Sequence, residues 1–115
     1  MTYNKDWVAK KLEADPNYHR RLHLKKKFKM TLEEFDRLVE AQNGVCVICG
    51  GVNKDRRLAV DHDRSCCPDQ LKTCGECIRG LLCSNCNNGI GRFMESPELL
   101  SKAAEYLKSR RVKIK

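Results

Sequence analysis

The sequence predicts a small α+β domain in which short strands and flanking helices are held together by metal-bound cysteines. Two Cys-x-x-Cys pairs, at residues 46–49 and 83–86, have the spacing of a four-thiolate metal site. Amphipathic helical patterns lie on both sides of these pairs, and a short apolar strand lies between them. A chain of 115 residues with few aromatics has room for one domain with a modest core, so bound metal is expected to supplement hydrophobic burial.

Residues 1–30 are predicted to form a basic, helical N-terminal extension. Pro16 interrupts the helical pattern and suits the first turn of a helix. A second helix is therefore expected to begin near Asn17, with Asp15 as its candidate cap. The segment carries nine Lys and Arg residues against three Asp and Glu residues, so it combines a helical pattern with a strong positive charge.

A new helix is predicted to start at Thr31. Thr31 and Glu34 have the spacing of a capping box, in which the hydroxyl and the carboxylate satisfy each other's backbone N–H groups. The helix is expected to end at the Asn-Gly pair at residues 43–44. The apolar residues that share one face of this helix are Leu32, Phe35, Leu38 and Val39.

The middle of the chain is predicted to contain turns, short strands and one short helix. Residues 46–51 are typical of a zinc knuckle, whose paired glycines permit a tight turn. Residues 58–60 are expected to form a strand that leads into an Asp-His step. A polar, cysteine-rich segment follows at residues 64–79, residues 80–83 return toward the knuckle, and residues 84–92 form a short helix.

The last helix is predicted over residues 97–109, with Ser96 as its cap and Pro97 in its first turn. Together with the basic tail, it makes residues 96–115 the third segment of the chain. Residues 31–95 then form the core between the two flanking segments. The apolar face of the last helix comprises Leu99, Leu100, Ala103, Ala104 and Leu107.

The charge distribution favours a nucleic-acid partner. The net charge is +8, and both ends of the chain are basic while the middle is acidic. Such a protein could grip a phosphate backbone and carry its carboxylates to the point of reaction, although basic runs can also be solvated tails. The residues expected from this pattern to contact DNA are Arg20, Arg21, Lys25, Lys26, Lys27, Lys29, Arg110 and Arg111.

The eight cysteines favour a reducing compartment. In a secreted protein they would suggest a disulfide framework. However, the start of the sequence lacks the apolar core of a signal peptide, and no run approaches the length of a membrane span. We therefore expect zinc-bound thiolates in the cytosol of a bacterial or phage-infected cell.

The cysteines form two candidate quartets. Four thiolates leave no open position on zinc, so the zinc ion bound by the two Cys-x-x-Cys pairs is expected to be structural; free thiols or disulfides are the alternatives. A second zinc ion is expected to staple the 64–79 segment, with a disulfide or a spare cysteine as alternatives. The first quartet is Cys46, Cys49, Cys83 and Cys86, and the second is Cys66, Cys67, Cys74 and Cys77.

Asp61, His62 and Asn87 are the candidates for chemistry. Phosphodiester hydrolysis requires an activated water and neutralisation of charge on the scissile phosphate. A neutral imidazole can take a proton from water near pH 7, and carboxylate and amide oxygens are ligands that magnesium accepts. Taken singly, His62 could be a surface residue and Asn87 a helix cap. Their placement within the zinc frame favours the chemical role.

Three runs of the sequence resemble the recombination endonuclease VII branch of the HNH nucleases: AQNGVCVICG (41–50), VDHD (60–63) and RGLLCSNCN (79–87). The resemblance implies a ββα-metal fold, also called a His-Me finger, in which a zinc-braced hairpin and helix surround one divalent ion. It also implies that Asp61 and Asn87 bind magnesium or manganese and that His62 is the general base. Arg64 stands where well-known members often have a second histidine, and we expect it to contact phosphate.

We therefore predict a metal-dependent HNH endonuclease that hydrolyses DNA phosphodiester bonds, by nicking or by double-strand cleavage. It is expected to act as a monomer or weak homodimer, with no membrane partner. The alternative function is a non-catalytic, zinc-dependent nucleic-acid-binding module, which would have no need for Asp61 and His62 beside Asn87. A protein-interaction zinc domain is a third alternative, which the charged ends disfavour.

Overall fold

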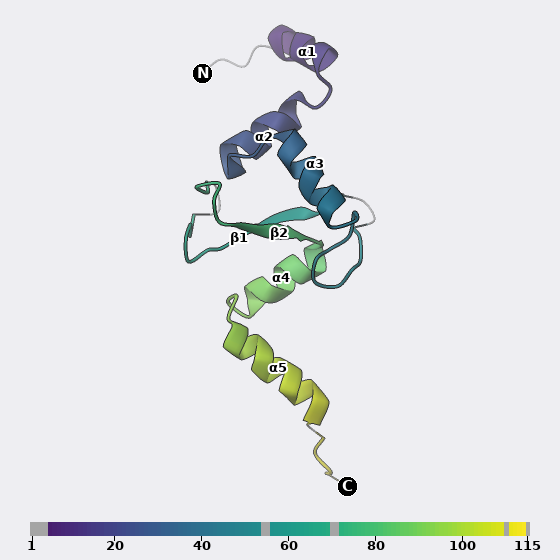
Figure 1. The fold of residues 1–115 in the computed structure, drawn as a ribbon, viewed down its shortest axis with the longest axis vertical. Helices are drawn as coiled ribbons and strands as arrows, with labels where there is room; N and C mark the ends of the chain where they lie inside the picture. Colours follow the sequence, from purple (N-terminus) through teal and green to yellow (C-terminus); the bar gives the residue numbers. More distant parts are fainter. Residues whose placement is uncertain (1–4, 54–55, 70–71, 110, 115) are drawn as a thin grey trace.

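The computed structural model describes residues 5–53, 56–69, 72–109 and 111–114 (Figure 1). Within these residues the α+β class is confirmed, with five helices and one two-stranded sheet. In chain order the elements are α1 (Lys5–Ala14), α2 (Tyr18–Phe28), α3 (Leu32–Ala41), β1 (Ala59–His62), β2 (Ile78–Leu82), α4 (Ser84–Arg92) and α5 (Pro97–Ser109). The molecule measures 69 × 28 × 27 Å, and the sheet lies between α1–α3 and α4–α5 along the long axis (Figure 1).

The break between α1 and α2 falls where Pro16 predicts it. The N-cap of α2 is Asn17, whose side chain makes no capping hydrogen bond, so the prediction of Asp15 as the cap is wrong. The Asp15 side chain instead accepts from the N–H of Asn17 at 3.1 Å. Trp7 on α1 meets Tyr18 on α2 edge to face, with ring centroids 5.8 Å apart. This aromatic contact joins the two basic helices.

The start and end of α3 agree with the predicted signals. The Glu34 N–H donates to Thr31 Oγ1 and the Thr31 N–H donates to Glu34 Oε1, both at 3.0 Å, which confirms the capping box. The helix ends at Ala41, and Asn43 and Gly44 follow with φ values of 56° and 74°. Both residues thus adopt the left-handed backbone that stops a helix.

The core of the molecule forms where α2, α3 and β2 meet. The Gln42 side chain joins α3 to β2, because its Nε2 donates to the Leu81 carbonyl at 3.0 Å and its Oε1 accepts from the Leu81 N–H at 2.9 Å. The Gln42 side-chain amide therefore satisfies both backbone groups of Leu81, as the backbone of a neighbouring strand would. The buried residues of the main cluster are Leu24, Phe28, Met30, Leu32, Phe35 and Leu81. Those of a smaller cluster are Cys46, Leu82 and Cys83.

The sheet is an antiparallel hairpin with a bulge. Asp61 pairs with Gly80 and His62 pairs with Ile78, so Arg79 is the extra residue on β2. Neighbouring residues of a regular strand point to opposite faces, and a bulge can re-aim them. The bulge therefore lies beside Asp61 and His62, at the end of β1. This strand begins at Ala59, one residue later than predicted.

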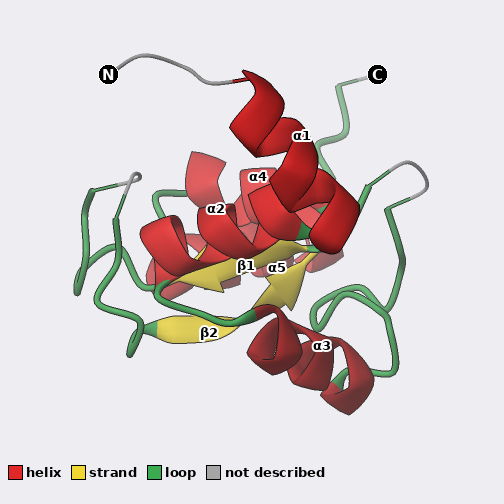
Figure 2. Ribbon diagram, turned by 90° about the horizontal axis from the view of Figure 1, so that it is seen from above, coloured by secondary structure: helices red, strands yellow, loops and turns green. Residues whose placement is uncertain are grey.

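The two loops around the hairpin leave it on opposite sides. In both views the loop between α3 and β1 lies on the right and the loop between β1 and β2 lies on the left (Figure 1, Figure 2). The first cysteine quartet is therefore at the open end of the hairpin, and the second is in the loop that closes it.

Helices α4 and α5 have the predicted bounds. Ser96 caps α5, since its Oγ accepts from the Leu99 N–H at 3.2 Å. No residue of α5 is buried, and Leu107 is 81% exposed, so the apolar face of this helix does not join the core. Among the described residues, no helix combines the length and the apolar character needed to cross a bilayer.

Candidate metal centres and active site

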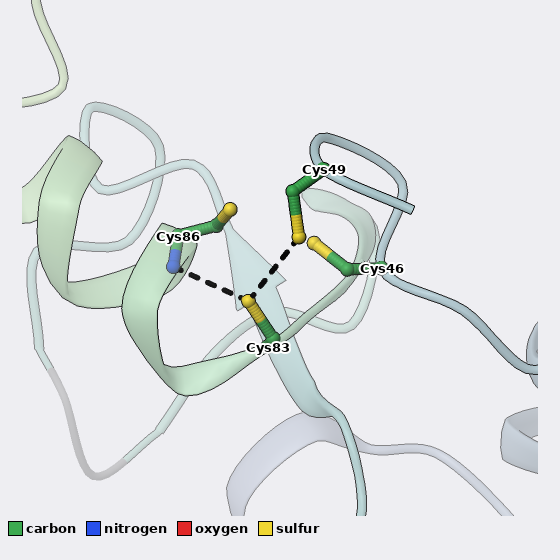
Figure 3. A group of neighbouring side chains, drawn as sticks. All are labelled: Cys46, Cys49, Cys83 and Cys86. Atoms are coloured by element: carbon green, nitrogen blue, oxygen red, sulfur yellow. Dashed lines mark hydrogen bonds between the residues drawn. The ribbon is translucent and has the colours of Figure 1, made fainter. Parts of the chain in front are cut away.

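The first cysteine quartet joins the loop after α3 to the start of α4 (Figure 3). Its four sulfur atoms lie within 4.8 Å of one another, and those of Cys49 and Cys83 are 3.7 Å apart. Zinc bound to four sulfurs at about 2.3 Å places neighbouring sulfurs about 3.8 Å apart, whereas a disulfide bond is about 2.05 Å long. The quartet therefore has the dimensions of a tetrahedral zinc site.

Backbone amides around the first quartet stabilise thiolates. The Gly51 N–H donates to Cys49 Sγ at 3.3 Å, and the Cys86 N–H donates to Cys83 Sγ at 3.4 Å. Burial acts to raise the pKa of Cys46, but hydrogen bonds from nearby amides outweigh it and lower that pKa to about 6. Burial and the neighbouring thiols raise the pKa of Cys86 to about 12. A bound cation would allow these crowded groups to ionise together.

The second quartet is also assembled. The sulfurs of Cys66, Cys67, Cys74 and Cys77 lie within 4.8 Å of one another. Those of Cys66 and Cys74 are 3.8 Å apart, and none of the eight cysteines is in a disulfide. Both quartets could therefore hold a zinc ion, and neither contains a disulfide.

The three residues predicted to carry chemistry meet in one hollow of about 210 Å³. Asp61 and His62, each 8% exposed, come from the end of β1. Asn87 lies in the first turn of α4, directly after a cysteine of the first quartet. The other residues that line the hollow are Lys27, Phe28, Val60, Arg64 and Glu95.

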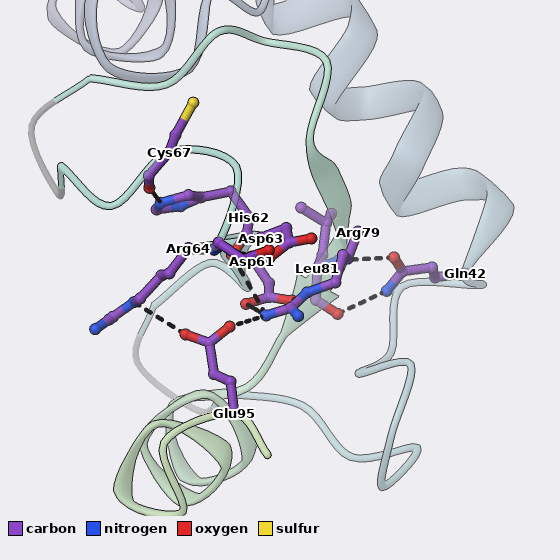
Figure 4. Close-up of polar contacts among 10 residues, drawn as sticks. Gln42, Asp61, His62, Asp63, Arg64, Cys67, Arg79, Leu81 and Glu95 are labelled. Carbon is purple, nitrogen blue, oxygen red and sulfur yellow. Dashed lines mark hydrogen bonds and ion pairs between the residues drawn. The ribbon is translucent and has the colours of Figure 1, made fainter. Parts of the chain in front are cut away.

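Arg79, the bulge residue, holds the Asp61 carboxylate (Figure 4). Its Nε donates to Asp61 Oδ2 at 2.7 Å and its Nη2 donates to Oδ1 at 3.1 Å. Nη2 also donates to the His62 carbonyl and to Glu95. The hydrogen bond to Asp61 raises the pKa of Arg79; partial burial opposes this rise, and Glu95 adds to it. The guanidinium thus fixes the carboxylate while leaving further lone pairs on its oxygens.

The His62 ring is held on two sides. Its Nε2 lies 3.1 Å from the main-chain carbonyl oxygen of Cys67 (Figure 4). Its ring centroid lies 6.4 Å from that of Phe28. A carbonyl oxygen only accepts hydrogen bonds, so this contact requires a proton on Nε2. In the neutral ring, Nδ1 is then the nitrogen with a free lone pair.

Two of the predicted DNA contacts on α2, both arginines, already have partners within the protein. Arg21 lies between Asp15 and Glu33, with N–O distances of 2.9 and 2.7 Å. The Arg20 guanidinium lies 4.3 Å from the centroid of the Phe35 ring. Both arginines therefore have partners within the fold.

Most of the other predicted contacts are accessible. Arg64 pairs with Glu95 at 3.0 Å and lines the hollow together with Lys27. Arg110 lies outside the described residues. The predicted contacts that are simply exposed are Lys25, Lys26, Lys29 and Arg111.

Two polar residues of the site have no role in the sequence-based prediction. Arg79 lies within the RGLLCSNCN run, but its partner Asp61 is 18 residues away on the other strand. Glu95 follows α4 at a φ of 52° and meets both Arg64 and Arg79. Neither pairing leaves a local pattern in the sequence, because both depend on how the hairpin and α4 come together.

Comparison with known proteins identifies the family of this chain. The family model of recombination endonuclease VII matches residues 21–109. The gene 59 protein of Mycobacterium phage D29 is 41% identical over 81 residues, which cover 69% of this chain and 44% of that protein. The gene 59 protein of Mycobacterium phage L5 is 39% identical over 80 residues, which cover 68% of this chain and 43% of that protein. The chain thus spans less than half the length of these relatives. Because the family match includes both cysteine quartets and the whole hollow, the chain belongs to the recombination endonuclease VII family, as its three sequence runs predict.

Proposed function

We propose that the protein is a metal-dependent endonuclease of the HNH type, which hydrolyses DNA phosphodiester bonds. In this proposal β1, β2 and α4 form the ββα-metal core. The observation that carries it is the meeting of Asp61, His62 and Asn87 in one polar hollow beside a cysteine quartet. A binding module would not need an imidazole, a carboxylate and an amide to line the same hollow.

The donors in the hollow fit a hard divalent cation. An Asp61 carboxylate oxygen and the Asn87 amide oxygen would hold magnesium or manganese, which prefer oxygen ligands and retain some of their waters. Such an ion, when bound, supplies charge neutralisation at the scissile phosphate. Arg79 keeps Asp61 oriented, and the first quartet anchors α4 one residue before Asn87.

His62 is proposed to act as the general base. With Nε2–H donated to the Cys67 carbonyl, Nδ1 is free to take a proton from the attacking water. The ring is 8% exposed and packs near Phe28, so it is held in one place before substrate arrives. One site per chain leads us to expect nicking by a monomer, and double-strand cleavage when two copies act together.

Cationic side chains near the hollow are proposed to position the DNA backbone. Lys27 and Arg64 line the hollow itself, and exposed lysines extend the positive charge along α2. Contacts of this kind set the register of the duplex without reading its sequence. Because the named relatives are phage proteins, we place this activity in the cytoplasm of a phage-infected cell.

The test is nicking of supercoiled plasmid with magnesium, comparing wild type with His62→Ala. We expect the substitution to slow nicking by about 100-fold or more, because general-base catalysis contributes that much. His19→Ala, which removes an exposed histidine from α2, is the matched control and should cleave normally. If wild type and His62→Ala are equally inert while both still retard DNA in a gel, the protein is a binding module instead.

A further inference from the structure

We propose that the second cysteine quartet is a structural zinc site that positions His62 through the main-chain carbonyl of Cys67. The part that concerns the general base rests on the proposed function, whereas the zinc site and the ring geometry do not. Cys67 is the link, because its sulfur belongs to the quartet and its carbonyl oxygen lies 3.1 Å from His62 Nε2.

The quartet repeats the features of the first one. The sulfurs of Cys66 and Cys74 are 3.8 Å apart. Neighbouring sulfurs in a tetrahedral zinc site are separated by the same distance, about 3.8 Å. The Cys74 N–H donates to Cys67 Sγ at 3.2 Å, and the Glu76 N–H donates to Cys74 Sγ at 3.4 Å. The first quartet likewise receives amide hydrogen bonds on Cys49 and Cys83, so both sites prepare sulfur for a cation.

The loop that carries this quartet has little apolar packing to define its shape. Among its described residues, from 63 to 77, Thr73 is the buried one. Its N–H donates to the Lys27 carbonyl at 2.9 Å, which ties the loop to the end of α2. Gly75 has a φ of 83°, and a Cβ there would lie 3.2 Å from the Phe28 carbonyl oxygen. The loop therefore lies against α2, but zinc would be needed to fix its conformation.

The position of the Cys67 carbonyl follows from both ends of this short turn. The Asp63 carbonyl accepts from the N–H groups of Cys66 and Cys67, each at 3.1 Å, which fixes the turn directly after β1. The Asp63 side chain accepts from the N–H and Oγ of Ser65 at 2.9 and 2.7 Å. The quartet holds the other side of the turn, since Cys66 and Cys67 must both face the sulfurs of Cys74 and Cys77. Without zinc, the carbonyl that orients the base would lose this restraint.

Zinc content and the state of the His62 ring can be measured without any cleavage assay. We expect about two zinc ions per wild-type chain and about one in Cys74→Ser. Nitrogen-15 NMR of the histidine rings should show the Nε2–H tautomer for His62 in wild type and a mixture of tautomers in Cys74→Ser. His62→Ala identifies the signal. Lys72→Gln, which changes an exposed side chain of the same loop, should keep both zinc ions and the tautomer.

Cleavage kinetics then distinguish positioning from a general loss of structure. In Cys74→Ser we expect kcat for plasmid nicking to fall by about 10- to 100-fold, as is usual when support of a catalytic group is lost, with KM unchanged. The same substitution in a His62→Ala background should cause no further fall, because there is no ring left to position. Cys74→His, which retains a zinc ligand, should recover zinc and most of kcat.

Several results would overturn the proposal. One zinc ion per wild-type chain, or disulfides among the four cysteines, would remove the second zinc site. If Cys74→Ser loses one zinc ion but keeps the tautomer and kcat, the second quartet does not position His62. The same conclusion follows if Cys74→Ser lowers kcat as much in the His62→Ala background as in wild type. If wild type cleaves no DNA, the proposed function fails, and the zinc count and NMR spectrum still decide this inference. Should Cys74→Ser not fold, brief chelation of wild type provides the same comparison, because the second quartet is more exposed than the first and should lose its zinc ion sooner.

Discussion

Arg79 and Asp61 form an ion pair beside the hollow, with Nε 2.7 Å from Oδ2. The Arg79 side chain is 41% exposed and that of Asp61 is 10% exposed, so the carboxylate depends on the guanidinium more than the reverse. The pair restricts Asp61 to one orientation, in which both oxygens face a planar donor. The energetic value of such a half-exposed pair is modest, about 1 kcal/mol, and its main effect is on geometry.

Arg79→Gln is expected to weaken the response to magnesium. Loss of the bidentate contact frees the Asp61 carboxylate to rotate, and loss of support behind a metal ligand typically reduces metal affinity or activity by about 10-fold or more. Arg79→Lys should not restore it, because an ammonium cannot bind both oxygens in one plane. The measurement is the magnesium concentration that gives half-maximal nicking.

Arg37→Gln is the charge-matched control for this prediction. Arg37 is exposed on α3 and does not line the hollow, so its loss should leave the magnesium response unchanged. Equal magnesium responses in wild type and Arg79→Gln would show that Asp61 does not depend on Arg79.

At the residue scale, the sequence points to candidate chemical groups but not to the groups that hold them in place. Asp61, His62 and Asn87 stand out because their side chains suit a metal and a proton transfer within a cysteine frame. The supports are less visible: one is a main-chain carbonyl, that of Cys67, and another is a side chain 18 residues from its partner. Main-chain acceptors occur at every residue, so no sequence pattern can mark the one that is used.

Gln42 connects two elements that share no other regular pairing. It follows α3 and bonds both backbone groups of Leu81, a residue that is completely buried in β2. Gln42→Ala would leave the buried N–H of Leu81 without a partner, while the Leu81 carbonyl would still accept from the Val47 N–H at 3.3 Å. The unpaired N–H should lower the free energy of unfolding by about 2 kcal/mol. Urea denaturation of the zinc-loaded protein measures this.

Glu40→Ala on the same helix is the control for Gln42. Glu40 is exposed, and its substitution should change stability by less than about 0.5 kcal/mol. If the two variants unfold at the same urea concentration, water or another group replaces the Gln42 contacts.

The two quartets should differ in their effect on folding. Cys46 is 1% exposed and packs with Leu82 and Cys83 in a core cluster, whereas Cys66 and Cys74 are exposed. A structural zinc ion can contribute about 10 kcal/mol, which is as much as the whole stability of a small domain. Cys46→Ser should therefore abolish cooperative thermal unfolding followed by circular dichroism, while Cys74→Ser should retain it. A cooperative transition in Cys46→Ser would contradict the prediction that zinc in the first quartet is required for folding.

At the element scale, local signals predict helix ends well. The Thr31 capping box, the Asn43-Gly44 stop and the Ser96-Pro97 start all act within one turn of the chain, and the structure confirms them. The bulge at Arg79 is different, since it depends on the register between two strands that a loop separates. Register is a property of the pair, so neither strand alone predicts it.

The sequence is basic at both ends, and the β1–β2 hairpin, which carries Asp61 and His62, lies near the middle of the molecule (Figure 1). Each lysine that neutralises a DNA phosphate releases a counterion, which steepens the fall of affinity with salt by about 0.9 per contact. Replacing Lys25 and Lys26 together with Gln should therefore reduce the slope of log Kd against log salt by roughly 2. Fluorescence anisotropy with a labelled duplex at several salt concentrations measures this slope.

Lys102→Gln serves as the control for the salt dependence. Lys102 is an exposed lysine of α5 that is not among the predicted DNA contacts, so its loss should leave the slope unchanged. A slope that stays the same in the Lys25 and Lys26 double variant would place the duplex on another face.

The 69 Å long axis has a further consequence for the substrate. One turn of duplex advances about 34 Å, so a protein lying lengthwise on DNA would cover about two turns, or roughly 20 base pairs. The scissile bond would then fall near the centre of that footprint, with protein extending about one turn to either side. An oligonucleotide of a single turn would leave one half of the molecule without DNA to contact, so we expect the proposed nicking to require a longer duplex.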